Sequence, residues 1–179
     1  VFSDDPRWRI EHAQIIDTFD IKLFNRKIIP SIQPTHATSD MYWAEERLGE
    51  NRLLGAYAYN DLLKRSGRIA LGTDFPVEEV SPLNTFYAAI ARKDSNQFPE
   101  EGFLFQNKLS RMDALKGMTL WGAYANFEES EKGSIEVGKF ADFIIMDRDI
   151  LDVSEKRILQ TRLVATILNG NVVYSNRIH

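Results

Sequence analysis

Three polar side chains follow short apolar runs, and their types could bind a metal ion or move protons. His12 ends the run that begins at Arg9, His36 comes four residues after Ile32, and Asp74 ends a third run. Neutral imidazole nitrogens and carboxylate oxygens bind zinc and similar ions, and a carboxylate can also take a proton from water. In parallel α/β folds the carboxyl ends of strands converge on one face, where ligands bind. The pattern therefore indicates a candidate binding face.

Each of these residues also has a purely structural interpretation. A lone histidine at a strand end, such as His12, is more often a hydrogen-bonded structural residue than a metal ligand. His36 would lie in a loop beside Pro34, where it could simply be exposed to solvent. Asp74 precedes Phe-Pro and could cap a helix or a turn. The spacing alone leaves both interpretations open.

The elements that would position these residues alternate between strands and helices up to about residue 131. Apolar residues spaced three and four apart indicate helices, and short apolar runs indicate strands. Ser81 before Pro82, and Ser110 three residues before Asp113, are typical helix starts. This alternation predicts a parallel sheet with helical crossovers. In order, we expect a strand at 9–12, a helix over 15–23, a strand at 28–32, a helical stretch over 40–66, a strand at 68–74, and helices from 81 and 110.

The remainder of the chain, from about Lys132, has strand character. Residues 133–138 alternate between two glycines, and residues 143–146 form a continuous apolar run. Asn169-Gly170 stands between two further apolar runs, which is a strong hairpin signal because both turn positions need positive φ. We therefore predict two parts, an α/β part over 1–131 and an antiparallel part over 132–179.

Composition excludes several classes of protein. The chain has 179 residues, 44% of them hydrophobic, which is typical of one folded domain. It has no cysteine, so disulfides, thiolate metal sites and cysteine nucleophiles are excluded. The net charge of −4 and the lack of an apolar run of about 18 residues predict neither a nucleic-acid nor a membrane partner. A cytoplasmic location is the expectation, and the start at Val1 suggests a portion of a longer protein.

Several motifs occur together in an order that is typical of one enzyme family. The chain resembles the C-terminal part of the amidohydrolase-3 family over about residues 7–175. That family is a branch of the metal-dependent amidohydrolases and includes enzymes similar to N-substituted formamide deformylase. The motifs are Arg9–Gln14, Gln33–His36, Gly72–Val77, Lys132–Asp142 and Gly170–Tyr174, with Trp43, Leu48-Gly49 and Arg52 between the second and the third.

The resemblance implies an architecture. Residues up to about 131 would be the last three βα units of a TIM (β/α)8 barrel, containing its strands six to eight. Residues 132–179 would be the C-terminal share of a small β-sandwich that such enzymes build from both ends of the chain. His12 would then end strand six, His36 would follow strand seven, and Asp74 would end strand eight.

The resemblance also implies roles for individual residues. It places a metal-binding histidine at His12 and a metal-bound catalytic aspartate at Asp74, while Gln33 and His36 match a loop near the substrate. The implied cofactor is one or two divalent ions, with zinc expected. The implied reaction is hydrolysis of C–N bonds in small amides or formamides by a metal-activated water, with Asp74 as the base that passes a proton to the leaving nitrogen. The implied enzyme class is amidohydrolase, EC 3.5.

The chain departs from the family pattern in its ligand set. The family also uses a His-x-His pair, a lysine and a further histidine, but the three histidines here are His12, His36 and His179. Two ligands are fewer than the three of a usual catalytic zinc site. We therefore expect this chain to be inactive alone. The alternatives are a noncatalytic half-barrel that binds or self-associates, or a hydrolase of esters or halogenated rings. Open strand edges favour a homo-oligomer in every case.

Overall fold

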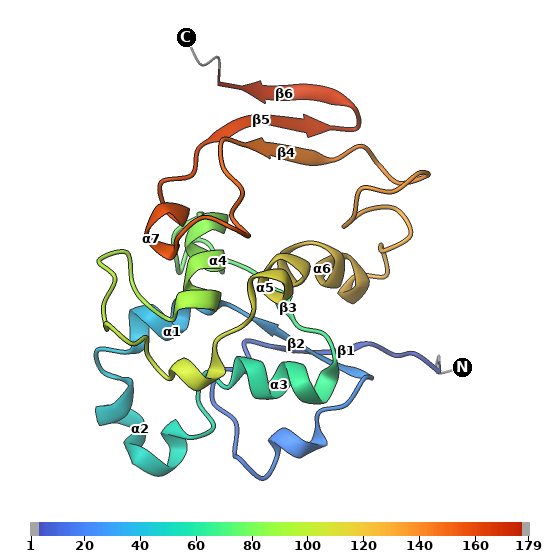
Figure 1. Ribbon diagram of the computed structural model, residues 1–179. Helices are drawn as coiled ribbons and strands as arrows, with labels where there is room; N and C mark the ends of the chain where they lie inside the picture. Colours follow the sequence, from blue (N-terminus) through green and yellow to red (C-terminus); the bar gives the residue numbers. More distant parts are fainter. Residues whose placement is uncertain (1–3, 177–179) are drawn as a thin grey trace.

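The computed structural model describes residues 4–176 and shows a mixed α/β fold with two separate three-stranded sheets. In Figure 1 the antiparallel sheet lies at one end of the molecule, and helices lie between it and the parallel sheet. The strands are β1 Trp8–Glu11, β2 Ile28–Ile32, β3 Ala70–Leu71, β4 Phe143–Met146, β5 Leu163–Leu168 and β6 Asn171–Ser175. The helices are η1 Ile21–Leu23, α1 Pro34–Asp40, α2 Ala44–Leu53, α3 Tyr59–Ser66, α4 Pro82–Ala91, η2 Phe105–Asn107, α5 Arg111–Met118, α6 Leu120–Ala125 and α7 Glu155–Ile158.

The first sheet is parallel, as predicted, in the order β1-β2-β3. β2 is its central strand, and the side chains of Ile29 and Ile32 are fully buried there. β3 is shorter than the predicted strand over 68–74, because only Ala70 and Leu71 pair with β2. All three strands run in the same direction, so the residues that follow them lie at one edge of the sheet.

The two predicted helix starts are confirmed. The hydroxyl of Ser81 accepts a hydrogen bond from the backbone N–H of Asn84 at the start of α4. The hydroxyl of Ser110 accepts one from the N–H of Asp113 at the start of α5. Each cap satisfies a backbone donor that the first helical turn leaves unpaired. The helix after Ser81 buries its apolar stripe in the core, with Phe86 completely inaccessible.

The predicted helix over 15–23 is wrong. Ile15 forms an isolated antiparallel bridge with Ala56, and the backbone N–H of Ile16 donates to the carbonyl oxygen of Gly55 at 3.0 Å. A side chain at position 55 would collide with the carbonyl oxygen of Ile16, so the approach requires glycine. These backbone contacts hold residues 15–16 extended, and only the short helix η1 forms later in the segment.

The loop predicted at Gln33–His36 and the continuous helical stretch over 40–66 are also corrected. Helix α1 begins at Pro34, whose fixed φ and missing N–H suit the first helical position. His36 consequently lies in the first turn of a helix. The later stretch divides into α2 and α3, and Gly49 inside α2 has a φ of 71° that interrupts the helical geometry.

The predicted hairpin is confirmed in the second sheet. β5 and β6 pair antiparallel around Asn169-Gly170, whose φ values are 48° and 75°. The strand expected at 133–138 is wrong, because these residues pair with no strand in the described chain and Ile135 and Val137 are exposed. The boundary near residue 131 stays a prediction. Within residues 4–176 no helix is both long and apolar enough to cross a membrane. His179 lies outside the described residues.

Candidate metal centre

His12, His36 and Asp74 come together at the carboxyl edge of the parallel sheet. His12 directly follows β1, His36 lies in α1 just after β2, and Asp74 comes three residues after β3. One ligand atom from each side chain lies within 4.8 Å of the ligand atoms of the other two. The sheet order explains this, because β2 is flanked by β1 and β3 and all three strands end on the same side.

Asp74 Oδ2 is the atom on which the two imidazoles converge. His36 Nε2 lies 3.3 Å from it and His12 Nδ1 lies 4.0 Å from it. The two rings stack at a centroid distance of 5.6 Å with an angle of 5° between their planes. Ligands held at about 2.1 Å from a tetrahedral zinc ion lie roughly 3.4 Å apart, so a single ion would need only a small closure of this group.

The buried nitrogen of His36 supports a ligand at this place. The His36 side chain is 10% exposed, and its Nε2 makes no hydrogen bond of suitable geometry within residues 4–176. A buried polar atom without a hydrogen-bond partner is costly, so this nitrogen is suited to binding an ion or a substrate. His12 is 47% exposed and Asp74 30%, so solvent and small molecules reach the group. The donor set fits a divalent metal ion.

The backbone at this site is strained. His12, Ala13 and Asp74 all have positive φ, at 65°, 41° and 61°. A residue with a side chain pays about 1–2 kcal/mol for the left-handed conformation, and such residues are concentrated at functional sites. The turn is stabilised locally, because the N–H of Ala13 donates to the carbonyl oxygen of Glu11 at 2.8 Å. Contacts with other parts of the chain must stabilise the rest of this unfavourable backbone geometry.

Gln33, the fourth residue expected near the substrate, precedes α1 and is buried. Its backbone carbonyl oxygen accepts hydrogen bonds from the hydroxyl of Tyr59 and from the N–H of His36. Its side-chain oxygen has no hydrogen-bond partner in the described part of the chain. The structure therefore places Gln33 in the same turn as His36, and its expected contact with substrate stays a prediction.

The sequence reasoning missed Glu78. Its Oε1 lies 4.0 Å from His36 Nε2 and accepts a hydrogen bond from the hydroxyl of Ser39 at 2.5 Å. The backbone N–H of Glu78 also donates to the carbonyl oxygen of Asp74 at 3.3 Å. The four-residue spacing between Asp74 and Glu78 could have indicated Glu78, because one helical turn brings residues with this spacing to the same face.

A hollow of about 320 Å³ lies beside the candidate metal centre. Its lining includes Thr35 from α1, Glu78 from the loop between β3 and α4, Tyr87 from α4, and Lys93 and Asp94 from the loop after α4. Glu78 therefore faces both this hollow and His36. Hydroxyl and charged groups share these walls with apolar surface, so the hollow offers both hydrogen-bonding groups and apolar contacts to a small molecule.

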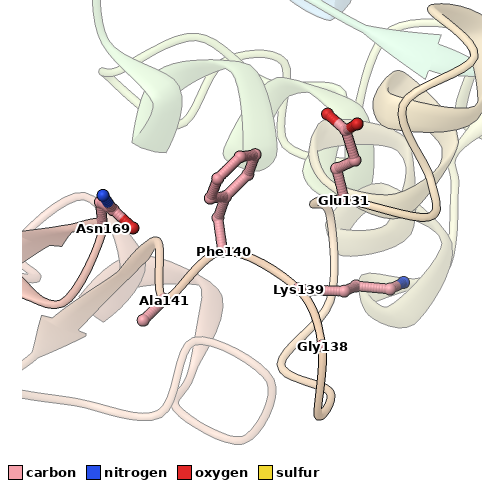
Figure 2. A pocket seen from close by; sticks show the side chains of 6 residues that line it. All are labelled: Glu131, Gly138, Lys139, Phe140, Ala141 and Asn169. Atoms are coloured by element: carbon pink, nitrogen blue, oxygen red, sulfur yellow. The ribbon is translucent and has the colours of Figure 1, made fainter.

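A second hollow, of about 460 Å³, is lined by none of the three metal-centre residues. Figure 2 shows the loop through Lys139 and Phe140 beside Asn169, which form part of its wall. Lys139 Nζ donates to the hydroxyl of Ser134 at 2.6 Å, and Asp142 Oδ1 accepts from the N–H of Asn169 at 2.7 Å. These contacts hold together the loop segments that contain Lys139 and Asp142.

Comparisons with known proteins place the chain among amidohydrolases. A model of the amidohydrolase family matches residues 2–174. Protein LONG AFTER FAR-RED 3 of Arabidopsis thaliana is 31% identical over 172 residues, which cover 95% of this chain and 29% of that protein. N-substituted formamide deformylase of Arthrobacter pascens is 29% identical over 127 residues, covering 70% of this chain and 23% of that enzyme.

A solved structure agrees with the sequence comparisons. The crystal structure of an uncharacterized metal-dependent hydrolase from Pyrococcus horikoshii OT3 is 32% identical, with a TM-score of 0.71 over 82% of this chain and 30% of that chain. The chain thus spans less than a third of the length of each of these three proteins. The family match nevertheless covers almost every residue here, including the three that converge at the candidate metal centre. The chain belongs to the amidohydrolase family.

Proposed function

We propose that this chain contributes part of a metal-dependent active site that hydrolyses C–N bonds in small, non-peptide amides or formamides. The convergence of His12 and His36 on Asp74 Oδ2, with His36 Nε2 buried and unpaired, is the observation that carries this proposal. Membership in a family that includes a formamide deformylase supports the choice of bond. Asp74 is the residue on which the proposed chemistry depends most.

Three side chains have separate roles in the proposed reaction. His12 and Asp74 hold the divalent ion, for which zinc suits the mixture of nitrogen and oxygen donors. When bound, that ion polarises the substrate carbonyl and lowers the pKa of water toward neutrality. Asp74 accepts the proton of the attacking water and delivers it to the leaving nitrogen. His36 Nε2, which is buried and makes no hydrogen bond in the described residues, contacts the substrate, with Gln33 beside it.

The rest of the site has to come from elsewhere in the protein. In the proposed architecture β1, β2 and β3 are three neighbouring strands of a (β/α)8 barrel, with residues 132–179 in a β-sandwich. The further ligands of the ion, and a second ion if there is one, would follow other barrel strands. A cytoplasmic location is part of the same proposal, and esters or halogenated rings are the alternative substrates.

A noncatalytic, self-associating module is the second candidate function. β1 is exposed along its whole length and pairs only with β2 in the described residues. Trp8 and Ile10 on this strand are 61% and 41% exposed. An open strand with exposed apolar side chains is a template for pairing with another chain. A homo-oligomer is therefore proposed for this chain on its own.

Calorimetric titration with Zn²⁺ tests the proposed metal centre. We expect the wild-type chain to bind Zn²⁺ and Asp74→Asn to bind at least about tenfold more weakly, since a charged ligand is lost. Asp61→Asn is the matched control, because Asp61 lies on the surface of α3 and pairs with Lys64. Equal affinities for wild type and Asp74→Asn would contradict the assignment. In the full-length protein, Asp74→Asn should abolish hydrolysis of a formamide panel and leave the circular dichroism unchanged.

A further inference from the structure

A hydrogen-bonded carboxylate outside the candidate metal centre joins the two elements that carry the histidines. Asp40 Oδ2 accepts a hydrogen bond from Gln14 Nε2 at 2.6 Å and another from the hydroxyl of Tyr57 at 2.8 Å. Gln14 comes two residues after His12, while Asp40 is the last residue of α1, four residues after His36. The Asp40 carboxylate therefore links helix α1 to the turn formed by residues 12–13, which we call the His12 turn.

Tyr57 is a rigid anchor for this carboxylate. Its side chain is fully buried, and its ring makes edge contacts with Tyr59 and Phe103 at centroid distances of 6.4 Å and 5.7 Å. Burial raises the pKa of Tyr57 to about 12, so its hydroxyl keeps the proton that it donates to Asp40. The backbone N–H of Tyr57 also donates to the carbonyl oxygen of Gln14 at 2.7 Å. Gln14 is thus held through both its backbone and its side chain.

The His12 turn needs such a restraint. His12 and Ala13 both have positive φ, which residues with side chains avoid unless the surrounding structure imposes it. Gln14 is the next residue, and its hydrogen bonds to Tyr57 and Asp40 tie this turn to distant parts of the chain. Release of Gln14 would let the turn relax toward ordinary backbone angles and move the imidazole of His12 away from that of His36.

We propose that Asp40 is a positioning residue that fixes the His12 turn to helix α1 and so sets the placement of the His12 and His36 rings. Asp40 contacts neither ring; it acts through Gln14 on one side and through its own helix on the other. The stacked rings, 5.6 Å apart, are the geometry that it maintains. The link to catalysis rests on the proposed function, whereas the positioning of the rings can be measured in the absence of metal.

The first test records the imidazole signals of the metal-free chain by NMR. The chain has three histidines, so their assignment is simple. We expect Asp40→Asn and Tyr57→Phe to shift the His12 ring signals. Tyr42→Phe is the control, because the Tyr42 hydroxyl also donates to an aspartate, Asp94 Oδ2 at 2.5 Å, in a more exposed pair outside the His12 turn. Tyr57→Phe keeps the packed ring, so it preserves the test if Asp40→Asn does not fold.

The second test measures Zn²⁺ affinity in the same four proteins. We expect Asp40→Asn to weaken binding about tenfold, which is the usual effect of removing a group that orients a metal ligand. Tyr42→Phe should leave the affinity unchanged. A lower melting temperature with unchanged ring signals would overturn the proposal and make Asp40 a stabilising residue only. A wild-type chain that binds no Zn²⁺ would overturn the proposed function instead, and the metal-free ring signals would still decide the role of Asp40.

Discussion

His36 Nε2 lies 3.3 Å from Asp74 Oδ2 although the two residues follow different strands. Glu78 Oε1 lies 4.0 Å from the same nitrogen, so His36 is placed between two carboxylates. The His36 side chain is 10% exposed and that of Asp74 is 30% exposed. His36 therefore forms the buried floor of the candidate metal centre, and Asp74 and His12 form its accessible rim.

The role of His36 can be separated from that of the proposed metal ligands. We expect His36→Asn to lower the rate of hydrolysis in the full-length protein about 100-fold, the usual cost of losing one group that contacts the reacting carbonyl. Zn²⁺ affinity should change less than about threefold, because His12 and Asp74 remain. Calorimetry and a rate assay on the same preparation measure both quantities. A tenfold or greater loss of Zn²⁺ affinity would instead make His36 a third metal ligand.

The contact between α5 and β3 supports the strand that leads to Asp74. A Cβ at Gly117 would lie 2.6 Å from Leu71 Cγ and 3.0 Å from the carbonyl oxygen of Ile69. Gly117→Ala should therefore lower the free energy of unfolding by about 1–3 kcal/mol, as overpacking usually does. Gly122→Ala is the control, since its nearest neighbour would be 3.6 Å away and alanine favours a helix. Urea unfolding measures both; equal stabilities would contradict the packing argument.

Local chemistry explains which parts of the fold the sequence could predict. Caps at Ser81 and Ser110 and the turn at Asn169-Gly170 depend on residues a few positions apart, so their patterns are visible in the sequence. The convergence of His12, His36 and Asp74 follows from strand direction alone once a parallel sheet is recognised. The caps and the hairpin turn were predictable because they depend on no distant part of the chain.

Long-range contacts explain what could not be predicted. Phe19 has helical spacing with the isoleucines before it, yet it is 75% exposed. Backbone bonds to residues 55–56 hold residues 15–16 extended, and Phe19 lies in the turn that follows them. Arg92 is fully buried at the end of α4, where burial lowers its pKa to about 10 and its Nε donates to the carbonyl oxygen of Phe103. No local sequence pattern predicts that an arginine will be buried. Asp40 and Tyr57 were missed for the same reason.

A single substitution that introduces a charge on β1 tests self-association through this strand. Ile10 is 41% exposed on a strand that has a partner on only one side in the described residues. A lysine on an exposed strand disfavours pairing with a second chain, so Ile10→Lys should weaken self-association about tenfold or more. Sedimentation velocity over a series of concentrations measures the effect. A wild-type chain that stays monomeric at every concentration would contradict the predicted homo-oligomer.

The ion pair between Arg7 and Glu129 predicts a pH-dependent stability. Both terminal nitrogens of Arg7 donate to the two carboxylate oxygens of Glu129, at 2.8 Å and 2.7 Å, and its guanidinium lies 3.6 Å from the ring centre of Tyr124. The hydrogen bonds from Arg7 lower the pKa of Glu129 below its ordinary value of 4.5. A carboxylate with a lowered folded-state pKa adds stability above its unfolded pKa and loses it as the pH falls through the folded value.

Glu129→Gln should therefore lower the free energy of unfolding by about 1 kcal/mol at pH 7, a modest figure because solvent screens this partly exposed pair. The difference from wild type should shrink as the pH falls below 4.5, since protonation then removes the same charge from the wild-type carboxylate. Glu131→Gln, an exposed neighbour, is the control. Urea unfolding at neutral and acidic pH measures the difference. An equal loss at both pH values would mean that Glu129 stabilises the fold through packing rather than through its charge.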